Sequence, residues 1–166
     1  LTDAMAPGTI AQLSQSDAIA FRVAFTGSFR GTAPAQSSLY RRALVMPDFD
    51  GRTWRASQTP EAYTTPPYVE QKGKPIDYEL TLEPHGKRWL FALESPTTLP
   101  TESGLTRDYQ LLSRQPVRSR LRDTQRTVPD IKKGLTESPE ILQESLALPK
   151  HSNPSTRAIA EGWRQR

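Results

Sequence analysis

The chain has 166 residues, 35% of them hydrophobic, with a net charge of +4 and no cysteine. The absence of cysteine excludes a disulfide scaffold, a thiolate metal site and a cysteine nucleophile within these residues. A modest net charge with both signs interspersed requires neither nucleic acid nor a membrane surface as a partner, and no apolar run reaches the roughly 18 residues of a membrane span.

The first half of the chain predicts short strands joined by loops. Residues 18–25 alternate with a period of two, which places one set of apolar side chains on a single face. Residues 38–46 predict a second strand, and the Asp-Gly dipeptide at residues 50 and 51 predicts a tight turn. Residues 57–75 are rich in proline, which predicts a long and mostly extended connection.

The second half of the β-rich region repeats the alternation. Residues 76–82 predict a strand, and residues 88–93 predict its antiparallel partner in a hairpin. Two further strands are predicted over residues 109–113 and 117–124.

Proline after a capping residue predicts two short helices, which begin at Ser138 and Asn153. Strands that precede helices, without βαβ alternation, predict a mainly β fold: an antiparallel β-sandwich or open barrel of short strands with a short C-terminal helical tail. We therefore expect a β-sandwich-like domain over residues 1–128 and a helical connector over residues 129–166. The missing initiator methionine and an end inside a predicted helix lead us to expect a piece of a longer protein.

The alternating segments predict one apolar core between two antiparallel sheets. Its expected members are Phe21, Val23, Trp54, Leu80, Leu82 and Leu90.

Three arginines with a spacing of two form the candidate binding surface of the sequence. They are Arg118, Arg120 and Arg122. Guanidinium groups on one strand face suit a phosphate, a carboxylate or an acidic partner domain. The alternative interpretation is a solvated outer face that pairs with acidic neighbours such as Asp123.

No residue is assigned to catalysis, to a cofactor or to a metal. Asp48 and Asp50 resemble the start of a calcium loop, but the later oxygen ligands are missing, which favours a turn. His85 and His151 have no partner at metal-ligand spacing. Neither Gly-x-Ser-x-Gly nor Ser-x-x-Lys occurs, whereas a triad that assembles only in space stays open as an alternative.

Several segments carry a family resemblance that extends over most of the chain. The most specific are Phe49-Asp50-Gly51-Arg52-Thr53-Trp54, Tyr78-x-Leu80-Thr81-Leu82-Glu83-Pro84 and Arg88-Trp89-Leu90-Phe91-Ala92-Leu93. Weaker ones are Met5-x-Pro7-Gly8-x-Ile10, Ala20-Phe21-Arg22-Val23-x-Phe25, Leu39-Tyr40 and Asn153-Pro154-x-x-Arg157-Ala158. These segments resemble the N-terminal part of the periplasmic region of TgpA-type proteins, which are membrane-anchored bacterial transglutaminase-like proteins. One departure is Arg41, where the family tends to have tryptophan.

The resemblance implies a β-rich region that precedes a papain-like transglutaminase core, whose Cys, His and Asp lie outside this chain. It implies that this piece is not an enzyme by itself and uses no cofactor. The implied location is periplasmic, as part of an inner-membrane protein whose membrane spans are absent from this chain. The implied partner is the parent's own transglutaminase-like domain.

The leading hypothesis is a non-catalytic periplasmic β-domain that packs beside that core or mediates interactions. The alternative is a self-contained binding module whose face of Arg118, Arg120 and Arg122 takes an envelope protein or acidic polymer, not nucleic acid. A small hydrolase with an unrecognised triad is the third hypothesis.

Overall fold

The computed structural model describes residues 3–8, 18–56, 62–63, 70–94, 96–150 and 152–165. The chain forms two compact units. The smaller unit combines Leu1–Gln15, Met46–Ser57 and Glu137–Arg166, and the larger unit combines Ser16–Val45 and Gln58–Thr136. The expected boundary between residues 128 and 129 stays a prediction.

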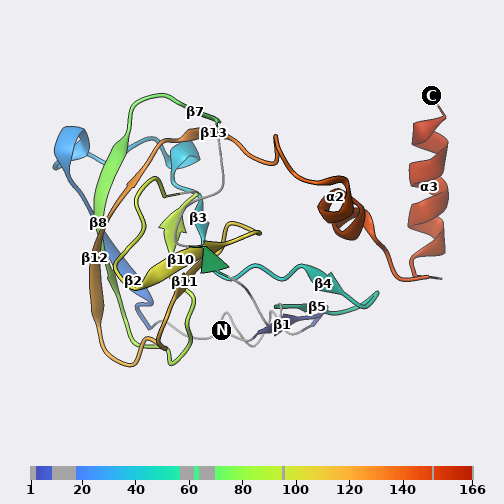
Figure 1. Ribbon diagram of the computed structural model, residues 1–166, viewed down its shortest axis with the longest axis horizontal. Coiled ribbons are helices and arrows are strands. Elements are labelled where there is room, and N and C mark those ends of the chain that lie inside the picture. The colour runs from blue at the N-terminus through green and yellow to red at the C-terminus, as the bar shows by residue number, and fades with distance from the viewer. Residues whose placement is uncertain are drawn as a thin grey trace. The chain divides into compact units, whose positions relative to one another are not determined.

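The larger unit is built around a three-stranded antiparallel sheet in the order β12–β8–β2 (Figure 1). The strands are β2 (Phe21–Phe25), β8 (Ile76–Leu82) and β12 (Leu121–Thr127). Strand β8 is central, so that Leu80 lies opposite Val23 on one side and Asp123 on the other. Every second residue of β8 is buried, because alternate side chains of a strand point to opposite faces of the sheet.

The other strands of the larger unit are short, and all their pairings are antiparallel. A second sheet has the order β11–β10–β6, from β6 (Ala62–Tyr63), β10 (Ser103–Thr106) and β11 (Leu111–Ser113). Two further pairs join β3 (Arg41–Arg42) to β9 (Ala92–Leu93) and β7 (Glu70–Lys72) to β13 (Asp130–Lys132). Single 3-10 turns, η1 (Gly27–Phe29) and η2 (Gln36–Ser38), precede β3. The mainly β, antiparallel prediction is confirmed.

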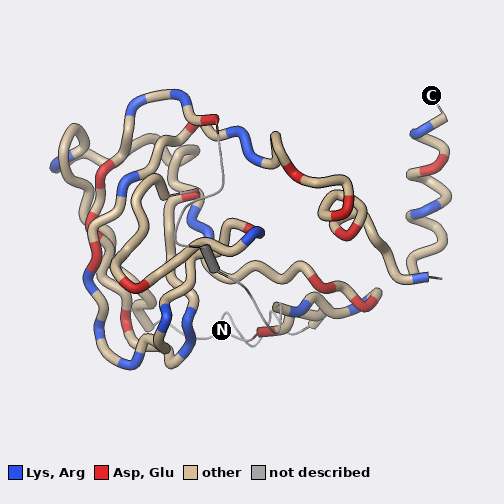
Figure 2. The backbone as a smooth tube through the Cα atoms, in the orientation of Figure 1, with Lys and Arg blue, Asp and Glu red and all other residues tan. Residues whose placement is uncertain are grey.

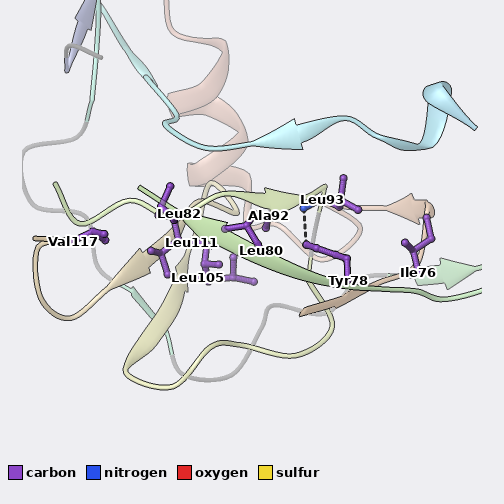
Figure 3. Close-up of a cluster of buried hydrophobic side chains, with 10 residues drawn as sticks. Ile76, Tyr78, Leu80, Leu82, Ala92, Leu93, Leu105, Leu111 and Val117 are labelled. Atoms are coloured by element: carbon purple, nitrogen blue, oxygen red, sulfur yellow. Dashed lines mark hydrogen bonds between the residues drawn. The ribbon is translucent and has the colours of Figure 1, made fainter. Parts of the chain in front are cut away.

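One cluster of buried side chains forms the core of the larger unit (Figure 3). Its members are Ile76, Tyr78, Leu80, Leu82, Leu90, Ala92, Leu93, Leu105, Leu111 and Val117. Phe21 and Val23 pack against this cluster while partly buried. The prediction that the alternating segments share one core is therefore confirmed for Phe21, Val23, Leu80, Leu82 and Leu90.

The prediction that Trp54 belongs to this core is wrong. Trp54 lies in the smaller unit and is 44% exposed. Its ring stacks on that of Phe49, with 4.4 Å between the ring centroids. Trp54 therefore lies at the surface of the smaller unit, beside the half-buried Phe49.

The predicted hairpin between residues 76–82 and 88–93 is also wrong. Both edges of β8 are occupied, by β2 and by β12, so residues 88–93 pair elsewhere. Trp89 forms a bridge with Leu112, and Ala92 of β9 lies opposite Arg42 of β3. Of the strand predicted over residues 38–46, only β3 forms, and most of the predicted connection at 57–75 lies outside the described residues.

The smaller unit has a three-stranded antiparallel sheet in the order β1–β5–β4 and two helices. Its elements are β1 (Ala4–Met5), β4 (Asp48–Phe49), β5 (Trp54–Arg55), α2 (Pro139–Leu146) and α3 (Pro154–Arg164). The predicted cap of α2 is confirmed, because the Ser138 side chain accepts a hydrogen bond from the Ile141 amide over 3.4 Å. Pro154 begins α3 as predicted, but Asn153 adopts a left-handed backbone and its side chain makes no capping bond. No helix in the described part of the chain is long and apolar enough to cross a membrane.

Candidate functional site

On the outward face of the β12–β8–β2 sheet, positive and negative side chains come from different strands. The central strand supplies carboxylates, and the flanking strands and their ends supply arginines (Figure 2). The ion pairs, with their N–O distances, are Arg22–Glu83 (2.6 Å), Arg120–Glu83 (3.1 Å), Arg122–Glu79 (2.7 Å) and Arg126–Asp77 (2.6 Å). These pairs are partly exposed, so each contributes little to stability, but together they neutralise most of the charge on this face.

The three arginines of the candidate binding surface occupy different environments. Only Arg122 lies within β12, which begins at Leu121, so the strand predicted to start at residue 117 begins late. Arg120 binds Glu83 through both Nε and Nη2, at 3.2 and 3.1 Å. Arg118 is exposed and forms no ion pair with any carboxylate of the described residues.

The arginines act on the ionisation of the carboxylates that they bind. Hydrogen bonds from Arg120 and then Arg22 hold the pKa of Glu83 below its usual range, and Arg126 does the same to the pKa of Asp77. An unfolded carboxyl group titrates near pH 4. The stabilisation from these pairs is therefore complete above that pH and is lost as the pH falls through the lowered folded-state values.

Asp123, expected as a neighbour of the arginine face, points to the opposite side of the sheet. It lies on the inward face of β12, and its Oδ2 atom is buried without a hydrogen-bond partner among the described residues. Burial raises the pKa of this carboxyl group, and hydrogen bonds from Gln125 and Thr124 offset only part of the effect. A buried carboxylate with an unpaired oxygen costs stability.

Asp123→Asn is expected to raise the free energy of unfolding at pH 7 by about 1 kcal/mol, the low end of the cost of an unpaired buried polar group. The raised folded-state pKa means that the aspartate destabilises the fold as the pH rises above about 4, where the unfolded chain loses its proton first. The gain should therefore shrink at pH 3. Urea unfolding at both pH values measures it. Asp130→Asn, at an exposed position of the same unit, is the control; a loss of stability at pH 7 would contradict the prediction.

A buried hydrogen-bonded network joins β8, β12 and β9. The Tyr78 hydroxyl accepts from the Leu93 amide over 2.9 Å and donates to Gln125 Oε1 over 2.6 Å. Gln125 Nε2 donates to the Phe91 carbonyl over 3.1 Å. Burial raises the pKa of the Tyr78 phenol, so it stays neutral and serves the structure rather than proton transfer.

His85, the single histidine of the described residues, is held by packing and a hydrogen bond within its loop. The His85 ring stacks on Trp89, with 3.9 Å between centroids and 6° between planes. Its Nδ1 accepts a hydrogen bond from the Lys87 amide, and burial lowers its pKa. No group of three or more His, Asp or Glu side chains in the described part of the chain is placed to hold a metal ion. His151 lies outside the described residues.

The Asp-Gly string forms the turn that the sequence predicts. Asp50 Oδ1 accepts hydrogen bonds from the amides of Arg52 and Thr53, over 3.0 and 2.8 Å. Gly51 has a φ of 102°, which favours glycine. The turn joins β4 to β5, so the Asp50 carboxylate stabilises the hairpin turn within the segment Phe49–Trp54.

Exposed apolar side chains concentrate in the smaller unit. Of the ten large apolar residues that the described part of the chain exposes, seven belong to this unit: Met5, Trp54, Leu142, Leu146, Leu148, Ile159 and Trp163. A hollow of about 400 Å³ lies in the same unit, lined by Met5, Ala6, Pro7, Phe49, Gly51, Arg52, Trp54 and Asn153. Sequence reasoning identified the two short helices that supply four of these side chains, Leu142, Leu146, Ile159 and Trp163, but it wrongly assigned Trp54 to the core of the larger unit.

Comparison with known proteins identifies relatives. The family model described as the TgpA N-terminal domain matches residues 1–130. The curated protein-glutamine gamma-glutamyltransferase of Pseudomonas aeruginosa is 37% identical over 166 residues, covering 99% of this chain and 24% of that protein. Crystal structures of the periplasmic domain of TgpA from the same organism, one of them bound to ethylmercury, match with TM-scores of 0.87 and 0.86 at 35% and 36% identity.

Those structures align with 99% of this chain, and the chain covers 56% of theirs. It therefore spans little more than half of the solved periplasmic domain and about a quarter of the curated relative. The resemblance and the periplasmic location predicted from the sequence are confirmed by these matches. Because the family model covers most of its residues, the chain belongs to the TgpA N-terminal domain family.

Proposed function

We propose that the chain is a non-catalytic domain that packs against the transglutaminase-like domain of its parent through the smaller unit. The observation that carries the proposal is the concentration of exposed apolar side chains in that unit. Exposed apolar patches on a soluble protein mark interaction surfaces. The named activity of the curated relative, glutamine gamma-glutamyl transfer, suggests the chemistry of the partner domain.

The two helices supply the clearest part of this surface. Leu142 and Leu146 are four residues apart on α2, as are Ile159 and Trp163 on α3, so each pair shares one helix face. Neither helix buries any residue, and Leu146 and Trp163 are 80% and 72% exposed. Because helices this short are marginal in water without tertiary packing, a partner surface would stabilise them.

The chain also lacks the group that acyl transfer of this kind requires. Covalent acyl transfer needs an activated nucleophile, and the sequence has no cysteine. The proposal therefore assigns the chemistry to the neighbouring domain. We expect no incorporation of an amine into a glutamine donor by the purified chain; turnover that a substitution within this chain abolishes would overturn the non-catalytic role.

Hydrogen exchange tests the packing. In the isolated chain, the amides of α2 and α3 are expected to exchange faster than those of β8, whereas in the longer protein with the transglutaminase-like domain they become protected. The variant Ile159→Ser/Trp163→Ser should lower the Tm of the longer protein by several degrees and leave that of the isolated chain almost unchanged. Ile19→Ser, at an exposed site of the larger unit, is the control.

Two outcomes would contradict the packing. One is equal protection of both helices with and without the neighbouring domain. The other is a Tm of the longer protein that responds to Ile19→Ser as strongly as to the helix variant.

The alternative function, a binding module that uses Arg118, Arg120 and Arg122, stays a prediction. Ion pairs with Glu83 and Glu79 already engage two of these arginines. A surface for an anionic partner therefore needs further cations besides these three.

A further inference from the structure

Two loops at one end of the β12–β8–β2 sheet are joined by backbone hydrogen bonds into one continuous surface. The loops comprise residues 84–88 and 114–120. The Gly86 amide donates to the Val117 carbonyl over 2.9 Å, and the Val117 amide donates to the Lys87 carbonyl over 2.8 Å. These bonds hold the cations of both loops side by side. We call the five Lys and Arg residues of these two loops the basic rim: Lys87, Arg88, Arg114, Arg118 and Arg120.

All charged residues of the two loops are positively charged. Residues 84–88 and 114–120 include five Lys and Arg residues and no Asp or Glu. Carboxylates reach the basic rim from other segments, Glu83 at Arg120 and Glu102 at Arg114. Figure 2 shows Lys and Arg positions gathered along these loops, at the lower left of the view.

Arg88 and Arg118 are the cations that this arrangement leaves for a partner. Both are exposed, and neither guanidinium pairs with a carboxylate of the described residues. The Nε of Arg88 donates to the Ser113 carbonyl over 2.9 Å, which orients its side chain and leaves the outer nitrogens available. Oriented guanidinium groups are good ligands for phosphate.

We propose that the basic rim contacts the anionic phospholipid surface of a bilayer. Exposed cations spread along two loops match a plane of repeated phosphates, whereas a single small anion would need donors that converge in a hollow. Solved relatives of this chain are periplasmic domains, and the periplasm is bounded by phospholipid membranes. Each Lys or Arg near an anionic lipid surface strengthens binding by about a factor of five. The inference is independent of the packing proposed for the smaller unit.

Vesicle binding at low ionic strength tests the proposal. The chain is expected to bind vesicles of phosphatidylglycerol and phosphatidylcholine and to release them as salt is raised, because salt screens exposed charges. Arg88→Gln/Arg118→Gln should weaken binding by about 25-fold, the product of two fivefold losses. Arg88→Lys/Arg118→Lys keeps both charges and should retain most of the affinity. Circular dichroism verifies that each variant is folded.

A control of equal charge separates position from net charge. Arg30→Gln/Lys132→Gln removes two exposed cations from the same unit outside the basic rim and should change binding by less than threefold, since screening weakens distant charges. Equal losses in both Gln variants would overturn the proposal, because only net charge would then matter. The proposal is also overturned if the chain binds vesicles of pure phosphatidylcholine as tightly as the anionic vesicles. Binding to a soluble anionic polysaccharide without binding to the anionic vesicles would overturn it too.

Discussion

Leu80→Ala is expected to lower the free energy of unfolding by about 2–5 kcal/mol, the range of large-to-small changes in a packed core. Leu80 is 3% exposed and lies at the middle of β8, the central strand of the main sheet. It belongs to the cluster of buried side chains shown in Figure 3. Because its neighbours come from several separate strands that support one another, they cannot move freely into the space that the side chain leaves.

The control removes the same atoms at the surface. Leu135 lies in the larger unit and is 53% exposed, so Leu135→Ala is expected to change stability by no more than about 0.5 kcal/mol. Urea unfolding followed by circular dichroism measures both variants. A loss below about 0.5 kcal/mol for Leu80→Ala would show that β8 does not face the core.

Local pattern was enough to predict the strands with regular alternation. Residues 18–25 and 76–82 became β2 and β8, because period-two burial is a property of the strand itself. The helix starts at Pro139 and Pro154 were likewise local, since each depends on a proline at the first helical position.

Strand partners could not be predicted in the same way. The segment 88–93 is apolar and follows β8 after a short turn, so a hairpin was the local interpretation. In the structure β2 and β12, which both lie far from β8 along the chain, occupy its two edges and leave none for this segment. Trp54 failed for a related reason. Its type predicts burial, but exposure is decided by the unit in which its short strand lies.

The candidate surface was predicted by spacing and altered by long-range contacts. The alternation of Arg118, Arg120 and Arg122 is visible in the sequence, but the carboxylates that engage two of them are on and beside β8. Glu83 and Arg120 are separated by 37 residues. Sequence alone therefore could not distinguish the engaged Arg120 from the available Arg118.

Tyr78→Phe is expected to lower the free energy of unfolding by about 2–3 kcal/mol, although it removes one oxygen and leaves the ring in place. That oxygen satisfies two buried groups, the Leu93 amide and Gln125 Oε1. Each buried polar group left without a partner costs about 1–3 kcal/mol. The matched control is Tyr40→Phe, at a side chain that is 62% exposed, for which we expect a change within about 0.5 kcal/mol.

A double-mutant cycle with Gln125→Leu distinguishes the network from simple loss of packing. If the Tyr78 hydroxyl and Gln125 satisfy each other, the first substitution already breaks their hydrogen bond, and the second removes only a group that has lost its partner. The double variant should then lose about 0.5–3 kcal/mol less than the sum of the single variants, which is the coupling typical of residues in one hydrogen-bond network. Additive losses would show that the two side chains stabilise the core separately. Coupling would show that β12 is held to β8 by side chains as well as by the strand ladder, and that both are held to the β9 segment through the Leu93 amide and the Phe91 carbonyl.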